Sequence, residues 1–401
     1  MMERIATKIM VLICILLLSG CSPANTDAGL SPDKYESAAA VTEGIRGIDL
    51  KLYGHMAFSG TGDGILYVNT TVSSMNPPDQ TEPVLLCAQA GCTHSDETCK
   101  AYIGNADYFL SYHNVWYYTV SESNNRLTLH SYDYKNGKRS VLHTWEGSEQ
   151  ESIAVDNMLA DHNRLYVSLY TASYSPEENT YYGKSKTDCI DLDQNTCVTV
   201  LESDEKEKVF EYCHNGKVLY TYTYLNGELP DYVEWIEQGK SEEEYSELLD
   251  RIFTSELHIL DTETSTDSLL GSGIATTGIK QFEKEKFAWH DGKTVYVYDI
   301  EKQNAVSLDV EGIAGVRIFD GNVIYTTRAE DGTFKVYAAG TDLLQEGKRI
   351  GSEDSSDCVP FSIKYETENG FFGIYNDAFY WIRKADFYSG RFESSIELGN
   401  I

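Results

Sequence analysis

One strand pattern recurs seven times along this chain, and the repetition constrains the fold more than any other feature. Each copy opens with a short apolar and aromatic strand, and these strands are 65–68 (ILYV), 115–118 (VWYY), 165–167, 218–220, 287–289, 323–325 and 371–374. A second, alternating strand that often ends in Asp follows, and its copies are 129–133, 189–193, 257–261 and 295–299, with looser versions at 334–338 and 379–383. Most copies lie about 50 residues apart, which is the length of a propeller blade of four antiparallel strands.

Asp-Gly and Asn-Gly pairs lie where tight hairpins need them, at 63–64, 136–137, 215–216, 291–292, 320–321 and 331–332. The pattern therefore predicts an all-β fold, a β-propeller of about seven four-stranded antiparallel blades. Six or eight blades are the alternatives, because the first and last copies are the least regular. Two unrelated β-sandwiches would not produce a common two-strand pattern at one period.

A long gap in the fourth copy is explained by a helical insert at 230–253. Tyr232, Trp235 and Ile236 have helical spacing, and Gly239 ends that run. The segment 241–244 (SEEE) has the form of a capping box, and an apolar stripe follows it. We expect two amphipathic helices on the rim or face of the propeller, where they either carry function or cover a blade edge.

The N-terminus has the features of an export signal. Arg4 and Lys8 precede an apolar run at 9–18 that is too short to span a bilayer, and small residues then lead to Cys21. This arrangement resembles the lipobox of bacterial lipoproteins, which implies cleavage before Cys21 and a lipid on its sulfur. An ordinary signal peptide or an N-terminal anchor is the alternative. The expected organisation is a signal peptide at 1–20, a flexible tether at 21–44 and the propeller at 45–401, lipid-anchored on the extracytoplasmic face of the cell membrane.

The charge of the chain restricts its partners. Its 401 residues carry a formal net charge of −31. A field of that sign repels nucleic acid and anionic headgroups, so we expect no nucleic-acid partner and contact with the membrane through the N-terminal lipid alone.

A cysteine–histidine cluster lies in the first repeat. Cys87, Cys92, His94 and Cys99 have the spacing C-x4-C-x-H-x4-C, with the number and type of ligands for a closed tetrahedral zinc site. A structural zinc ion is expected, with the sulfurs roughly 3.5–4 Å apart. The alternatives are a disulfide, which would leave one of the three thiols over, or inert thiols.

The lipobox, the Tyr-rich blades and the C-x4-C-x-H-x4-C segment together resemble uncharacterised surface lipoproteins of anaerobic Gram-positive bacteria, which carry TolB-like or domain-of-unknown-function propellers. The resemblance implies a fold and a location, and it brings no activity with it.

No catalytic motif supports an enzyme, since glycine-rich phosphate loops, H-E-x-x-H and G-x-S-x-G are absent from the sequence. We therefore expect a binding or scaffolding module for an unknown protein or glycan ligand. The alternatives are a carbohydrate-active hydrolase or lyase with its site at the channel mouth, and an accessory or sensor subunit of a membrane complex. Acids and aromatics from three blades meeting at one mouth would favour the enzyme.

Overall fold

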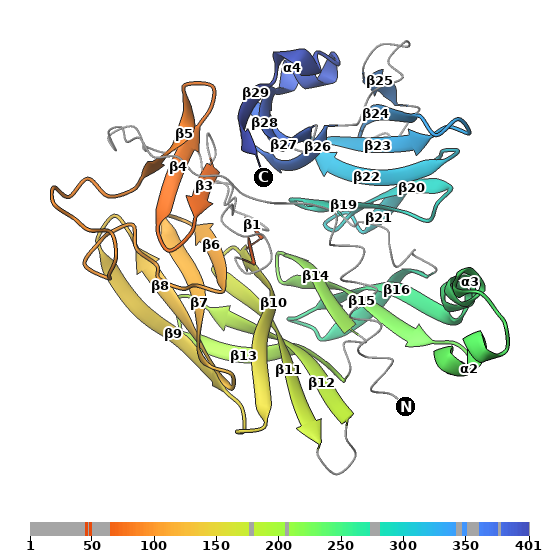
Figure 1. The fold of residues 1–401 in the computed structure, drawn as a ribbon, viewed down its shortest axis with the longest axis horizontal. Helices are drawn as coiled ribbons and strands as arrows, with labels where there is room; N and C mark the ends of the chain where they lie inside the picture. Colours follow the sequence, from red (N-terminus) through yellow and green to blue (C-terminus); the bar gives the residue numbers. More distant parts are fainter. Residues whose placement is uncertain are drawn as a thin grey trace.

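The computed structural model forms a ring of seven antiparallel sheets, which is a seven-bladed β-propeller (Figure 1). It describes residues 45–46, 48–49, 65–175, 180–204, 208–272, 281–341, 347–350, 361–375 and 378–400. The signal peptide at 1–20, Cys21 and the tether at 21–44 lie outside the described residues. The predicted fold class is confirmed.

The first four blades follow one another along the chain. The first blade has three described strands, β3 (Ile65–Val68), β4 (Val72–Asn76) and β5 (Gln80–Leu85). The second blade has β6 (Tyr108–Tyr112), β7 (Val115–Ser123), β8 (Arg126–Asp133) and β9 (Lys138–Glu146). The third has β10 (Glu151–Asp161), β11 (Arg164–Ser175), β12 (Thr180–Asp191) and β13 (Thr196–Asp204). The fourth has β14 (Lys208–His214), β15 (Lys217–Leu225), β16 (Phe253–Asp261) and β17 (Thr266–Ser272).

The last three blades have the same order. The fifth has β18 (Gln281–Glu283), β19 (Lys286–His290), β20 (Thr294–Asp299) and β21 (Asn304–Asp309). The sixth has β22 (Ile313–Phe319), β23 (Asn322–Arg328), β24 (Phe334–Gly340) and β25 (Lys348–Ile350). The seventh has β26 (Ser362–Glu366), β27 (Gly370–Tyr375), β28 (Ala378–Arg383) and β29 (Ile396–Asn400).

The helical insert lies in the fourth blade, as predicted. Helices α2 (Tyr232–Glu237) and α3 (Glu242–Ile252) join β15 to β16, and the capping box of Ser241 with Glu244 is present. A short helix that the sequence did not predict, α4 (Lys384–Tyr388), and a 3-10 turn, η2 (Phe392–Ser394), follow β28 in the seventh blade. Among the described residues, no helix is long and apolar enough to cross a membrane.

The aromatic strand of the sequence repeat is the second strand of a blade, and it stacks against the third. Four blades share this cross-strand pair of stacked rings, with centroids 5.0–5.2 Å apart: Tyr118 on His130, Tyr220 on His258, Trp289 on Tyr296, and Tyr325 on Tyr337. Cross-strand aromatic pairs stabilise sheets, which explains why the repeat keeps a ring at this position.

The Asp that ends the third strand has a separate role. Its carboxylate accepts hydrogen bonds from backbone N–H groups in the following turn, at Asp133, Asp191, Asp261 and Asp299. These bonds, with that from Thr264 the strongest, lower the pKa of the Asp261 carboxyl. Such side-chain turns favour Asp, so the repeated Asp is a hairpin signal.

Apolar residues fill the layers between neighbouring blades. Cys189 lies in the core shared by the third, fourth and fifth blades, whereas Cys197 packs against the core between the second and third. The two thiols therefore face opposite sides of the third blade, as the alternation of strand residues predicts. The hairpin between them turns at 192–195.

Side chains close the ring between the first and last blades. Met75 of β4 lies in one buried cluster with Phe372, Phe379 and Trp381 of the seventh blade. No strand is shared between the first and seventh blades in the described part of the chain.

Two short strands precede the first blade and lie at the inner edge of others. Strand β1 (Ile45–Arg46) pairs with β10, and β2 (Ile48–Asp49) pairs with β6. The first strands of neighbouring blades contact one another around the axis, as β6 does with β10 and β10 with β14. The chain just after the predicted tether therefore runs inside the ring (Figure 1).

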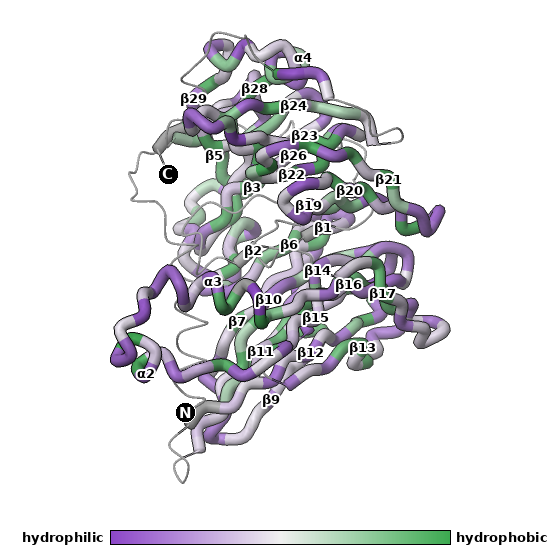
Figure 2. The backbone as a smooth tube through the Cα atoms, turned by 90° about the vertical axis from the view of Figure 1, so that its right-hand side faces the viewer, coloured by the Kyte–Doolittle hydropathy of each residue, from purple (hydrophilic) through white to green (hydrophobic). Residues whose placement is uncertain are grey.

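Strand order assigns each connection to one of two faces. Links from a second to a third strand, and from one blade to the next, lie on one face, which we call the insert face because it carries α2 and α3. Links from first to second and from third to fourth strands lie on the opposite face. In side view the α2–α3 hairpin projects from one side of the disc (Figure 2).

Candidate functional site

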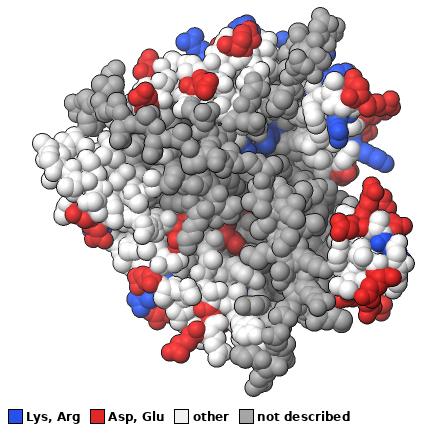
Figure 3. Space-filling model, in the orientation of Figure 1, with Lys and Arg blue, Asp and Glu red and all other residues white. Residues whose placement is uncertain are grey.

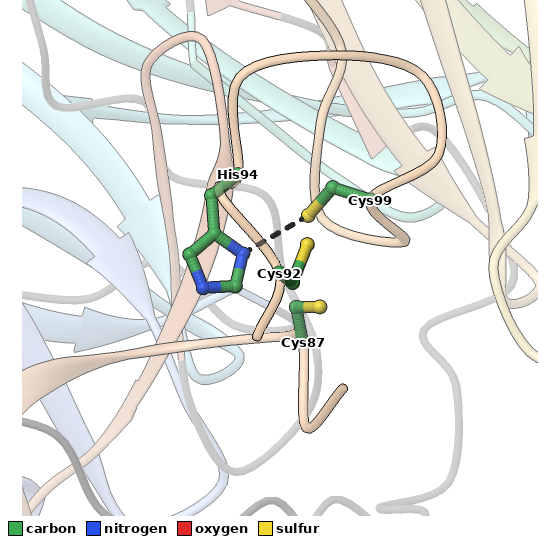
Figure 4. A group of neighbouring side chains, drawn as sticks. All are labelled: Cys87, Cys92, His94 and Cys99. Carbon is green, nitrogen blue, oxygen red and sulfur yellow. Dashed lines mark hydrogen bonds between the residues drawn. The ribbon is translucent and has the colours of Figure 1, made fainter. Parts of the chain in front are cut away.

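The cysteine–histidine cluster forms the best-defined constellation on the insert face. One ligand atom from each of Cys87, Cys92, His94 and Cys99 lies within 4.8 Å of all the others. His94 Nδ1 is 3.2 Å from Cys99 Sγ, and the four side chains point toward one centre (Figure 4). The structure therefore brings all four predicted ligands together.

The loop reaches this geometry through two left-handed residues. Gly91 has φ 75°, a conformation that glycine adopts without steric cost, and His94 has φ 55°. The Cys92 N–H donates to the Gln89 carbonyl at 3.2 Å and closes the first turn. These two turns bring Cys92 and His94 back toward Cys87, as expected for the glycine at this position.

Backbone N–H groups surround the sulfur atoms. Burial opposes ionisation of Cys87, but N–H groups of Gln89 and Lys100 and the neighbouring thiols donate to its sulfur and lower the pKa of the Cys87 thiol. The Ala101 N–H lies 3.3 Å from Cys99 Sγ. Burial nevertheless raises the pKa of the Cys99 thiol to about 12. N–H donors of this kind favour thiolate ligands over thiols.

The cluster belongs to the connection between the first and second blades, not to a turn within the first blade as the sequence suggested. Backbone hydrogen bonds fix its far end to the first blade, because Val72 N donates to Ala101 O at 2.8 Å and Ile103 N to Thr70 O at 2.9 Å. The loop is therefore built onto the edge of the first blade.

Arg139 of β9 fixes the same loop to the second blade. Its guanidinium donates to the Cys99 carbonyl at 3.2 Å, the Tyr102 carbonyl at 2.5 Å and the Tyr118 hydroxyl at 3.0 Å. It also lies 3.9 Å from the centre of the Tyr132 ring. Sequence reasoning missed Arg139, because it lies 40 residues beyond Cys99 on a strand whose pattern resembles any other outer strand.

Five cysteines of the described residues are free thiols: Cys87, Cys92, Cys99, Cys189 and Cys197. Cys213 is buried, as expected for a small apolar residue. Cys21, the predicted lipid attachment site, lies outside the described residues.

A second polar cluster lies on the opposite face, at the inner ends of three blades. Lys384 Nζ donates to Asp320 at 2.8 Å and to Glu366 at 2.7 Å. Glu283 accepts from the Gly321 N–H at 3.1 Å. Burial, together with repulsion from Glu366, raises the pKa of the Glu283 carboxyl. Carboxylates from the fifth, sixth and seventh blades thus meet there, a juxtaposition that linear spacing could not reveal.

No protein-family model matches the sequence, and no curated protein matches it. Many solved structures do match its fold. The chain is similar to Pyrococcus horikoshii acylaminoacyl peptidase, with 11% identity and a TM-score of 0.48 over 84% of this chain and 50% of that one. This chain therefore spans about half the length of that peptidase.

Two further structures are similar over most of this chain. One is the β-propeller domain of the Trilobed protease from Pyrococcus furiosus, with 10% identity and a TM-score of 0.46 over 88% of this chain and 99% of that one. The other is Porphyromonas gingivalis dipeptidyl peptidase 4, with 11% identity and a TM-score of 0.42 over 93% of this chain and 56% of that one. These likenesses concern the fold alone.

Proposed function

We propose that this protein is a binding or scaffolding propeller, lipid-anchored through Cys21 on the extracytoplasmic side of the cell membrane. A structural zinc ion held by Cys87, Cys92, His94 and Cys99 would fix part of its insert face. The observation that carries the proposal is the convergence of four ligand atoms within 4.8 Å on an interblade loop.

The donor set indicates a structural rather than a catalytic metal. Three thiolates and one imidazole satisfy tetrahedral zinc and leave no open position for water or substrate. Between Cys87 and Cys99 the loop contributes one buried side chain, that of Cys99, and the other three ligands are partly exposed. A metal ion would supply the order that apolar packing does not, and it would hold the first blade against the second.

The strands that lie at the ring axis support a binding role better than an active site at the channel mouth. Strands β1 and β2 lie along the inner edges of the third and second blades, where a channel-mouth active site would need open space. The carboxylates of the opposite face already share Lys384 and backbone N–H groups.

The second candidate is a carbohydrate-active hydrolase or lyase, and one observation favours it. Glu283, Asp320 and Glu366 come from three blades, and Tyr388 lies beside them through its hydrogen bond with Asn322. If the protein hydrolyses aryl glycosides and Glu283→Gln abolishes that turnover, the hydrolase hypothesis is correct. We expect no turnover from either form.

The zinc proposal is tested by metal content. Wild-type protein should carry one zinc ion per chain, and His94→Ala and Cys92→Ala should each lower the content to near zero. Thr93→Ala is the matched control, because Thr93 is exposed in the same loop and offers no ligand. Chelation should release the metal and leave far-UV circular dichroism of the blades intact, since each blade packs chiefly on its neighbours.

A disulfide would give a different result. Intact-mass analysis of unreduced protein would then show two hydrogens missing among Cys87, Cys92 and Cys99, no stoichiometric zinc, and no effect of His94→Ala. That outcome rejects the metal site.

The anchor is tested separately. Cys21→Ala should release the protein from membranes or block its processing, because acyl chains on that one residue would supply the attachment. Unchanged detergent partitioning of the variant would reject lipidation while leaving the zinc proposal untouched.

A further inference from the structure

The α2–α3 hairpin carries an exposed apolar pair that the fold does not use. Val233 and Ile236 lie three residues apart on one side of α2, and they are 39% and 40% exposed. Leu225, at the end of the strand that leads into the hairpin, is 41% exposed. No residue of α2 is buried.

The aromatic residues of α2 fix the hairpin in one shape. Tyr232 and Trp235 pack edge-on against Tyr245 of α3, with centroids 5.0 and 5.6 Å apart. Trp235 Nε1 donates to the Ser241 carbonyl at 3.1 Å, and Lys240 lies 3.8 Å above the indole ring. Because these aromatic contacts lie within the hairpin, Val233 and Ile236 are exposed on a preformed shape that need not rearrange on binding.

The hairpin that carries the exposed pair is rich in acidic side chains. The exposed carboxylates of the two helices are Glu234, Glu237, Glu242, Glu243, Glu244 and Glu247. Figure 3 shows Asp and Glu gathered on this hairpin, with few basic residues beside them. Recognition surfaces commonly have an apolar centre and a polar rim whose charge complements that of the partner.

We propose that the outer side of α2, with Val233 and Ile236 at its centre and Glu234 and Glu237 at its rim, docks a cationic amphipathic segment of a partner protein. This deepens the proposed binding role by giving the partner's chemistry. The partner's apolar side chains would cover the exposed pair, and its Lys or Arg residues would meet the rim. The small apolar area implies a transient interaction.

The negative charge of the protein favours a cationic partner segment over the other possible occupants of this surface. A second copy of the chain would bring acidic rim to acidic rim, and the net charge of −31 adds to that repulsion. Nucleic acid and anionic lipid are disfavoured for the same reason.

The test measures, by fluorescence anisotropy, binding of the full-length chain to a fluorescein-labelled 18-residue Lys/Leu peptide designed to form an amphipathic helix. We expect saturable binding that Val233→Ser/Ile236→Ser weakens at least about tenfold, because two central apolar contacts are lost. Glu234→Gln/Glu237→Gln should weaken binding several-fold and reduce its salt dependence. A Glu/Leu peptide of the same pattern should not bind.

Matched controls separate this surface from the rest of the acidic protein. Val141→Ser/Val198→Ser changes two apolar residues that are 56% and 57% exposed on other blades. Glu311→Gln/Glu330→Gln removes two exposed charges far along the chain. Both control variants should bind the peptide within twofold of wild type, and all variants should keep the wild-type melting temperature.

Three results would overturn the proposal. The first is that the hairpin variants bind as wild type does, and the second is that the control pairs weaken binding equally, which means attraction to net charge alone. The third is that Val233→Ser/Ile236→Ser converts a sedimenting dimer to a monomer, which makes a second copy the occupant. Because the zinc content does not depend on the hairpin, none of these results bears on the metal site.

Discussion

Arg139 should control how tightly the cysteine–histidine loop holds zinc, although it contributes no ligand. Its guanidinium makes three hydrogen bonds, to Cys99, Tyr102 and Tyr118, and stacks on Tyr132. Arg139→Ala removes all four contacts, so the ligand Cys99 loses its tie to the second blade.

The magnitude follows from these contacts. Each hydrogen bond from a charged donor is worth about 1.5–3 kcal/mol, and the contact with the buried Tyr132 ring about 1–2 kcal/mol. The substitution removes part of the same contacts from the zinc-free loop, so only the difference between the two states weakens zinc binding. We expect this difference to be about 2–3 kcal/mol, which is a loss of zinc affinity of about 30- to 100-fold. Loss of groups that orient ligands typically costs about 10- to 100-fold in affinity.

The assay is competition between the protein and a zinc indicator of known affinity. Arg139→Lys should fall between wild type and Arg139→Ala, since an ammonium cannot span both carbonyls and the ring. Arg126→Ala is the control, because Arg126 lies on the adjacent strand and makes only exposed ion pairs, with Glu122 and Glu146. Affinity of Arg139→Ala within twofold of wild type, or an equal loss in Arg126→Ala, would refute the reasoning.

Further predictions concern packing between and within blades. The buried carboxylate of Asp188 accepts a 2.7 Å hydrogen bond from Trp145 Nε1 of the preceding blade, so Asp188→Ala should lower the free energy of unfolding by about 3–5 kcal/mol in urea titrations. Burial opposes ionisation, but bonds led by that from Thr199 lower the pKa of Asp188. The stabilisation of the fold by the ionised Asp188 carboxylate is therefore present above about pH 4 and is lost as the pH falls through the folded-state pKa. Because Asn does not titrate, the free energy of unfolding of Asp188→Asn should fall less steeply with decreasing pH than that of wild type. Gly373→Ala should cost about 1–3 kcal/mol or more, because its Cβ would lie 2.3 Å from a ring carbon, whereas Gly340→Ala, with nothing within 4 Å, should be neutral in the same assay.

The fold was predictable because each sequence repeat carries the same short-range side-chain interactions. Stacked pairs such as Tyr220 with His258, and side-chain turns such as that of Asp261, depend on residues a few positions apart or on neighbouring strands. The helical insert was predictable for the same reason, since the capping box of Ser241 is local.

The site was only partly predictable. The four ligands Cys87 to Cys99 lie within one loop, so their spacing carried the signal. Arg139, in contrast, reaches the loop from an outer strand, and Glu283 meets Glu366 only because three blades converge. Contacts between blades depend on the curvature of the ring, which the residues of one strand do not encode. Helix α4 was missed because five residues give too little periodicity to detect.

The strands at the inner edge have a consequence for the order in which the chain folds. Arg46 of β1 pairs with Leu159, more than a hundred residues later, whereas each blade is assembled from hairpins made within a few dozen residues. Closing so long a loop costs entropy that local hairpins do not, so we expect β1 and β2 to dock only after the second and third blades exist. During synthesis this early segment would thus find its place only after later parts of the chain have folded. In the finished protein this segment should exchange its amide hydrogens sooner than the blades that surround it.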